Sequence, residues 1–98
     1  MLEINKQNSA EEDLIDIWLY SLGEWDARTA DKYLDLIERA IQNLLAHPRS
    51  GTDCSEIRKG YRRLIVQHHR IYYQITPNSI EIIRVLHQST DEESHFKT

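Results

Sequence analysis

The sequence contains one cysteine, Cys54, and no apolar run that approaches the roughly 20 residues a membrane-spanning helix needs. A lone cysteine excludes an internal disulfide and any zinc site built from several cysteines. The opening stretch MLEINKQNSAEED lacks the basic and then apolar order of a signal peptide, and no internal repeat or low-complexity tract follows it. We therefore expect a cytoplasmic protein that does not enter a membrane.

The adjacent pair His68 and His69 is the other place where metal binding has to be considered. Neighbouring residues of a strand point to opposite sides, and an ion would need further ligands of suitable geometry. We therefore expect no metal site and no cofactor.

A chain of 98 residues, 40% hydrophobic and 29% charged, is large enough for one core and too short for two. We expect a single domain over residues 1–98. Its net charge of −4 is unevenly spread: residues 1–46 hold ten acids and four bases, residues 47–87 three acids and seven bases, and residues 88–98 three acids and one base. An acidic half is thus followed by a basic region, whose partners have to be considered separately.

The first half of the sequence has the apolar spacing of two amphipathic helices. Ser9 followed by Glu12 is a capping-box pattern, which predicts a first helix over residues 10–24. Asp26 predicts the N-cap of a second helix, which Pro48 ends because a proline disfavours helical geometry in the residue before it. The short link GEWD between the two predicts an antiparallel helical hairpin.

The second half changes to the period of two that is typical of strands. Residues 48–60 are polar and turn-rich, and predict a loop with a short strand or turn near Cys54. Residues 61–67, 71–76 and 80–87 are rich in β-branched and aromatic side chains and predict an antiparallel meander, to which residues 2–6 could add a fourth strand. The predicted fold is α+β, with a helical hairpin packed on one face of a small antiparallel sheet.

Strand alternation places Arg62 and Arg63 on opposite sides of the sheet. On the third strand it puts Ile80, Ile82, Arg84 and Leu86 on one side and Glu81, Ile83, Val85 and His87 on the other. Both sides of that strand are largely apolar, which indicates a central strand or one whose second face is also covered. The exposed face or its edge would gather arginines, tyrosines and a histidine, which could bind phosphates, stack on bases and transfer protons. The alternative is a set of solvated strand residues whose stems cover apolar surface.

Several short motifs in a fixed order carry a family resemblance. They are AEEDL at residues 10–14, Pro48 with Gly51, IR at 57–58 with GYR at 60–62, and RVLH at 84–87 with Asp91. Together they resemble the ParE branch of the RelE/ParE toxins of type II toxin–antitoxin systems, which arrest growth and stabilise plasmids. The resemblance covers nearly the whole chain and implies the same helical hairpin on a small sheet.

The resemblance also implies a ParD-like antitoxin, encoded alongside, whose C-terminal segment wraps the toxin. The surface it would cover is the apolar groove of the helical hairpin plus the sheet edge. Candidate contacts are Leu14, Trp18, Tyr33 and Ile37, each of which could instead be a core residue.

Two target classes follow from the resemblance. ParE-like toxins poison DNA gyrase, whereas RelE-like relatives cut messenger RNA in the ribosomal A site. RNA cleavage would need Arg62, Arg63 and Arg84 as cations and His87 for proton transfer. The SHF sequence at 94–96 resembles the ending of some ribosome-dependent relatives, but it lies in an acidic tail that would repel RNA.

Gyrase poisoning needs a contact surface rather than a catalytic set, and we favour it. The candidate target contacts are Arg58, Arg62, Arg63, Arg70, Tyr72, Arg84 and His87, with residues 88–98 as a mobile tail. We expect no sequence-specific binding of nucleic acid by the chain itself. A third possibility is a non-toxic relative that acts only with its antitoxin in autorepression.

Overall fold

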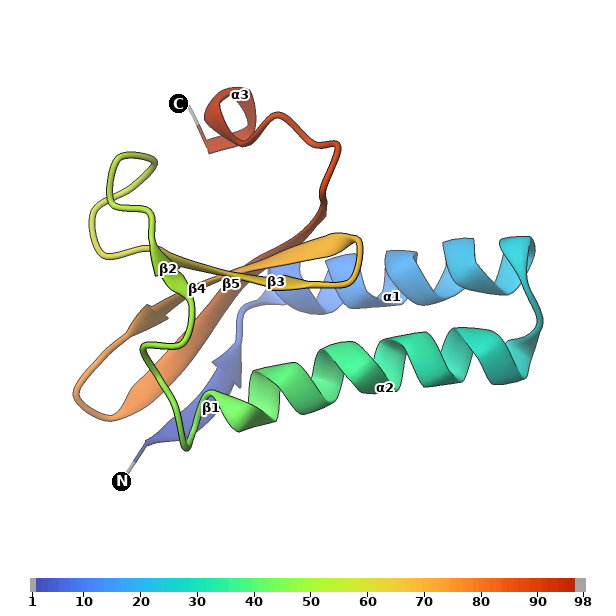
Figure 1. The fold of residues 1–98 in the computed structure, drawn as a ribbon, viewed down its shortest axis with the longest axis horizontal. Helices are drawn as coiled ribbons and strands as arrows, with labels where there is room; N and C mark the ends of the chain where they lie inside the picture. Colours follow the sequence, from blue (N-terminus) through green and yellow to red (C-terminus); the bar gives the residue numbers. More distant parts are fainter. Residues whose placement is uncertain (1, 97–98) are drawn as a thin grey trace.

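The computed structural model describes residues 2–96, in which one five-stranded sheet carries two long helices and a short third one (Figure 1). The elements in chain order are β1 (Glu3–Lys6), α1 (Asn8–Glu24), α2 (Ala27–Asn43), β2 (Thr52–Asp53), β3 (Arg62–Val66), β4 (His69–Ile75), β5 (Ser79–His87) and α3 (Glu92–Phe96). The strands are ordered β1-β5-β4-β3-β2. This confirms the predicted α+β fold, and no helix of the described part is long and apolar enough to cross a membrane.

The sheet is antiparallel except at one edge. The predicted meander is formed by β3, β4 and β5, and β2 extends it beside Arg62 and Arg63. The predicted N-terminal strand is β1, which pairs in parallel with β5 from Glu3 opposite Ser79 to Lys6 opposite Ile82. As a result β5 is a central strand, as its two apolar sides predicted.

The helical hairpin covers one face of the sheet and forms the main core. Figure 1 shows α1 and α2 side by side on this face, while α3 lies on the other side of the sheet. The stripe of α2 predicted from the sequence supplies Ile37 and Ile41, which are fully buried against Ile71 and Ile82. Most of the apolar area removed from water therefore lies in this layer.

The two long helices begin differently. Asp26 is the N-cap of α2 as predicted, because its side chain accepts from the Thr29 amide at 2.8 Å. The predicted capping box of α1 is wrong, since the N-cap is Gln7 and its side chain makes no capping hydrogen bond within the described part of the chain. The Gln7 amide instead donates to the Ile82 carbonyl at 3.0 Å, so the pairing of β1 with β5 runs directly into the helix. A long-range contact, rather than a local cap, sets this helix start.

Along β5 the predicted alternation holds as far as Ile83. Tyr73 pairs with Ile82 but Tyr72 pairs with Arg84, so that Ile83 is an extra residue in a β-bulge. Beyond the bulge Val85 lies in the main core, while Leu86 and Ile83 belong to a second apolar cluster on the other face. The predicted grouping of Val85 with Ile83 is therefore wrong, because one inserted residue reverses the faces of all that follow.

The second sheet face is covered, which is one of the two possibilities that the apolar sides of β5 indicated; the expectation that the tyrosines lie on an exposed face is wrong for Tyr72. Cys54, Tyr72 and Leu86 are buried there, and side chains from the loop and from α3 pack on them: Ile57, Tyr61, Ile83 and Phe96. The part of the C-terminal tail that the structure describes ends in α3 on this cluster. The last two residues of the predicted tail lie outside the described residues.

Candidate functional site

The arginines of β3 are held by different parts of the chain. Arg62 is on the side of the helices, at the edge beside β2, and donates to the Gly51 carbonyl at 3.1 and 2.7 Å and to the Arg49 carbonyl at 3.1 Å. Arg63 points to the opposite side and forms an ion pair with Glu92 of α3. The predicted separation of the two side chains is confirmed, and each guanidinium has an internal partner.

Glu92 is the centre of the polar contacts under α3. Its carboxylate accepts hydrogen bonds from Arg63 and from the Tyr72 hydroxyl, and the Arg70 guanidinium lies 3.7 Å away. Burial and the Glu92 hydrogen bond raise the pKa of Tyr72 to about 12. Burial alone would raise the pKa of Glu92, but the Tyr72 and Arg63 hydrogen bonds and the two arginine charges lower it on balance. The carboxylate is therefore held in its charged form.

Arg84 is tied to the first helix. Its guanidinium donates to both carboxylate oxygens of Asp13, at 2.7 and 2.8 Å, and the hydrogen bond raises the pKa of Arg84. Asp13 also accepts from the Val85 amide at 2.9 Å. Because β1 ends opposite Ile82, this side chain takes the place of a strand partner on the open edge of β5.

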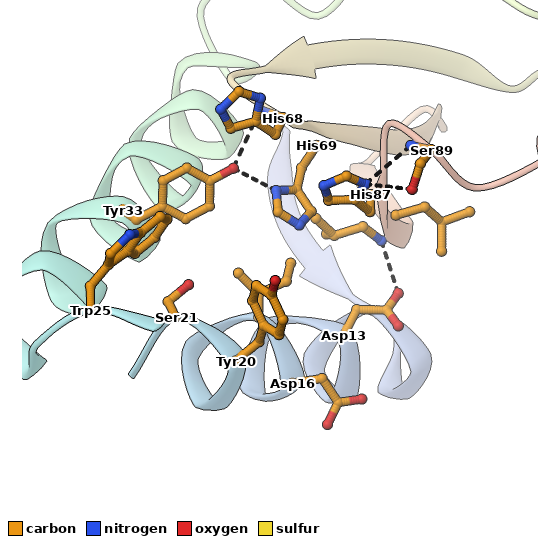
Figure 2. Close-up of a pocket in the computed structure, with 13 residues that line it drawn as sticks. Asp13, Asp16, Tyr20, Ser21, Trp25, Tyr33, His68, His69, His87 and Ser89 are labelled. Atoms are coloured by element: carbon orange, nitrogen blue, oxygen red, sulfur yellow. Dashed lines mark hydrogen bonds between the residues drawn. The ribbon is translucent and has the colours of Figure 1, made fainter. Parts of the chain in front are cut away.

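A cleft of about 610 Å³ lies where the helical hairpin extends past the ends of the strands. It is lined by α1, by the start of α2, by the β3–β4 turn and by the end of β5: Asp13, Asp16, Ile17, Tyr20, Ser21, Trp25, Tyr33, His68, His69, Val85, Leu86, His87 and Ser89. Figure 2 shows His69 and His87 next to each other and Tyr33 pointing toward His69. The cleft thus combines aromatic, imidazole and carboxylate groups.

The surroundings of His69 in the cleft favour its neutral form. The Tyr33 hydroxyl accepts from the His68 amide at 3.3 Å and lies 2.6 Å from His69 Nδ1, so it donates to that nitrogen. Burial, followed by the nearby His87 and His68, lowers the pKa of His69 to about 4. The Ser89 amide donates to His87 Nδ1 at 3.1 Å. Residues 2–96 contain no group of three or more potential ligands that could hold a metal ion.

Among the described residues, the four side chains of the ribonuclease hypothesis have no partner in common. Arg62 is bound to the loop at Gly51, Arg63 to Glu92, and Arg84 to Asp13 and His95. His87 lines the cleft and is bound to Ser89.

Five of the seven candidate target residues contact one segment of the chain, residues 90–96. The chain from Thr90 to Phe96 contacts Arg58, Arg63, Arg70, Tyr72 and Arg84.

The candidate antitoxin contacts divide into two pairs. Leu14 and Ile37 are core residues and offer no surface, because the apolar stripe of each helix faces the sheet. Trp18 is partly buried and donates from Nε1 to Asp31 at 2.8 Å, and Tyr33 lines the cleft.

Sequence reasoning missed exposed apolar groups on α1, of which Ile15, Leu19 and Tyr20 are 59%, 54% and 68% exposed. The spacing of Ile15 and Leu19, out of phase with Leu14 and Ile17, was the available signal.

Comparisons with known proteins agree with this architecture. The family model described as "ParE toxin of type II toxin-antitoxin system, parDE" matches residues 4–92. Toxin ParE1 of Mycobacterium tuberculosis is 38% identical over 89 residues, which cover 90% of this chain and 91% of that protein. Toxin ParE1 of Caulobacter vibrioides is 37% identical over 87 residues, covering 89% and 90%.

A solved structure described as "Chromosomal ParDE TA system from P. aeruginosa" has the same fold. Its TM-score is 0.79 at 18% identity, over 89% of this chain and 96% of that one. The family match spans the helical hairpin, the whole sheet and the start of α3. This chain belongs to the ParE toxin family of type II toxin–antitoxin systems.

Proposed function

We propose that this toxin poisons DNA gyrase and that a ParD-like antitoxin keeps it inactive. The observation that carries the choice of target is the separation of the residues an RNA-cleaving site would need. Arg62, Arg63, Arg84 and His87 have four different sets of partners. Cleavage needs a base, an acid and phosphate-binding cations within hydrogen-bonding reach of one phosphate.

Gyrase poisoning makes a smaller demand on the fold. An inhibitor that binds one state of an enzyme more tightly shifts the enzyme toward that state, and it needs only a stable surface. The toxin would hold gyrase in the state where DNA is cleaved, so that replication stalls. We assign this contact to the basic residues of β3, β4 and β5, with Arg58 of the preceding loop at their margin. On the strands these are Arg62, Arg63, Arg70 and Arg84.

An antitoxin partner is supported by the comparisons, since the family description names parDE and the P. aeruginosa structure is of a ParDE system. The surface we assign to it is the cleft at the end of the hairpin together with the exposed apolar side chains of α1. Tyr20 and Trp25 are exposed there, beside the exposed acidic group Asp16. A partner segment with apolar and basic residues would fit, and we expect it to be disordered until it binds.

The deciding experiment mixes the purified toxin with gyrase, ATP and supercoiled plasmid, and traps the products with detergent and protease. Linear DNA that increases with toxin supports gyrase poisoning. Absence of linear DNA, together with cleavage of ribosome-bound messenger RNA in a translation extract, would replace this proposal with the ribonuclease alternative. Complex formation with the antitoxin but no effect in either assay would favour the non-toxic autorepressor.

Variants tie the activity to the basic region. Arg58→Ala removes an exposed cation whose hydrogen bond goes to the Phe96 carbonyl, and it should reduce the amount of linear DNA. The matched control is Arg39→Ala, which removes an exposed cation from α2 that is paired with Asp35 on the same helix. If Arg58→Ala, Arg62→Ala and Arg84→Ala were all as active as Arg39→Ala at equal protein level, the assigned surface would be wrong.

A further inference from the structure

The short helix α3 contacts most of the basic surface from one side. Arg58 donates to the Phe96 carbonyl at 3.2 Å, Arg63 pairs with Glu92, and Arg84 Nη1 lies 2.7 Å from His95 Nε2. Arg70 lies 3.5 Å from the Thr90 carbonyl and 3.7 Å from Glu92, and Tyr72 donates to Glu92. We call these five residues, together with Tyr61, the arginine face. The arginine face is thus covered by a segment of its own chain, residues 90–96.

Two side chains of α3 are partly buried against this face, while the exposed His95 adds one hydrogen bond with Arg84. Glu92 and Phe96, one helical turn apart, are partly buried, whereas the three residues between them are exposed. The Phe96 ring packs edge-on against Tyr72 and Tyr61, with centroid distances of 4.8 and 5.6 Å. A helix of five residues is unstable alone in water, so α3 is helical only while these two anchors hold it.

Charge also matches across this contact. The arginine face contributes four guanidinium groups, and the segment that covers it carries Asp91, Glu92 and Glu93. The Glu92 carboxylate sits among Arg63, Arg70 and Tyr72, a donor set that fits a single carboxylate. Beside it the rings of Tyr61 and Tyr72 receive an aromatic side chain. The face is therefore complementary to a carboxylate followed one turn later by an aromatic ring.

We propose that α3 is a detachable clasp, and that the arginine face binds, in its place, a partner protein segment with a carboxylate and an aromatic ring one helical turn apart. The inference deepens the proposed function, because this face carries most of the candidate target contacts. With α3 docked, Glu92 pairs with Arg63 and lies 3.7 Å from Arg70, and Phe96 packs on the two tyrosines. With α3 released the arginine face is cationic and exposes Tyr72, which is otherwise fully buried.

A protein segment fits better than a nucleic acid. The Phe96 ring meets Tyr61 at 87° and Tyr72 at 62°, which are edge contacts, whereas bases stack face to face on aromatic rings. The chain as a whole is negative, with the acidic α1 adjoining the arginine face through the Asp13–Arg84 pair. Long-range repulsion therefore opposes a polyanion, while a short acidic segment with one aromatic side chain matches the site.

The test supplies the clasp in trans. The full chain is labelled with ¹⁵N and titrated with a synthetic peptide of residues 88–96, QSTDEESHF, and the shifts of the Arg63 and Arg70 amides are followed. The protein is either unchanged or carries Glu92→Gln and Phe96→Ala, which remove both anchors. Glu93→Gln is the matched protein control, since Glu93 is an exposed acid of the same helix.

We expect the peptide to bind the double variant about tenfold or more tightly than the unchanged chain, because the apparent affinity falls with the fraction of free face. The Glu93→Gln chain should behave like the unchanged one. A peptide with the same two changes, Glu→Gln and Phe→Ala, should not bind. Equal binding to all chains, no binding of the first peptide to the double variant, or equal binding of both peptides would overturn the inference.

A second measurement needs no variant and decides the matter if the double variant does not fold. The backbone amide of His95 in α3 donates to the Asp91 carbonyl. The hydrogen exchange of the His95 amide is compared with that of the β4 amides. A detachable clasp predicts exchange on the order of 100-fold faster in α3, because α3 opens without unfolding the domain. Exchange as slow as in β4 would overturn the inference.

Two further outcomes distinguish the clasp from a nucleic-acid site and from the gyrase proposal. Displacement of the peptide by a single-stranded DNA oligonucleotide, with tighter binding of the DNA, would overturn the choice of a protein segment. The peptide assay contains no gyrase, so its failure is distinct from failure of the plasmid-cleavage assay. Linear DNA without peptide binding would retain the proposed function and reject the clasp.

Discussion

The sheet face under α1 and α2 and the face under α3 are built from the same strands, yet they are covered in different ways. On the first, two helices of 17 residues each bury a continuous apolar cluster. On the second, a helix of five residues is held by one carboxylate and one aromatic ring over a smaller cluster. Apolar burial grows with contact area, so the first face carries the stability of the domain and the second is open to exchange.

The largest expected effect comes from the first face. Ile37→Ala removes a fully buried side chain between α2 and the sheet, and should lower the free energy of unfolding by about 3–4 kcal/mol. The midpoint of urea denaturation measures this. Leu36→Ala is the matched control, because Leu36 is 46% exposed on the same helix. Similar losses for the two variants would contradict the assignment of the main core.

The next effect concerns the loop that joins α2 to β2. A Cβ at Gly51 would lie 2.6 Å from the buried Tyr73 hydroxyl and 2.9 Å from the Arg63 carbonyl, and would disturb the bond from the Gly51 amide to that hydroxyl. Gly51→Ala should therefore cost about 2–3 kcal/mol of stability.

Gly23→Ala is the control, since no atom of residues 2–96 lies within 4 Å of its added Cβ and alanine favours a helix. Thermal unfolding of both variants makes the comparison, and an unchanged melting temperature for Gly51→Ala would show that the loop adapts.

A smaller effect is expected from pH, again on the side of the helices. His69 has a pKa of about 4 in the folded protein and an ordinary value of 6.5, because burial disfavours its charged form. Between these values the unfolded chain binds more protons, so stability is full above about pH 6.5 and falls as the pH is lowered. From pH 7 to 5 the loss should be about 1–2 kcal/mol, allowing for the partial exposure of the ring.

Urea denaturation at the two pH values measures this loss. His69→Gln keeps a polar group beside Tyr33 but does not titrate, so its stability should change less over the same range. An identical pH dependence in His69→Gln would assign the effect to other groups.

The smallest effect on stability belongs to the second face. Phe96→Ala removes the aromatic anchor of α3 and should lower the free energy of global unfolding by about 1 kcal/mol or less, because α3 detaches before the domain unfolds. Comparison with Ile37→Ala by urea denaturation tests the contrast directly. A loss from Phe96→Ala as large as that from Ile37→Ala would remove the distinction between the two faces.

Local patterns predicted most of the architecture. The Asp26 cap, the spacing of Ile37 and Ile41, and the short link between the helices depend on neighbours in sequence, and each is confirmed. The capping box at Ser9 was equally clear as a pattern but is not used, because Gln7 is already paired with Ile82 of a distant strand. Local signals fail where a long-range contact competes for the same backbone group.

The candidate sites were predicted less well than the fold. The sequence contained the arginines and Tyr72, and alternation correctly separated Arg62 from Arg63. It offered no sign that Glu92, about 30 residues further along the chain, would meet Arg63, or that the acidic tail would cover this face. Leu14 and Ile37 were proposed as contacts because an apolar stripe looks the same whether it faces the sheet or a partner.

By itself the sequence determined the two long helices and the strands β1, β3, β4 and β5, because helical and strand periods are properties of neighbouring residues. It did not predict the helix α3, since five residues are too few to show a period. It also determined the charge of each region and, through the order of its motifs, the family. Only the tertiary structure decided that the bulge at Ile83 turns Val85 toward the helices, that Asp13 takes the open edge of β5, and that α3 rests on the arginines. These features depend on groups far apart in the chain, whose meeting no local pattern records.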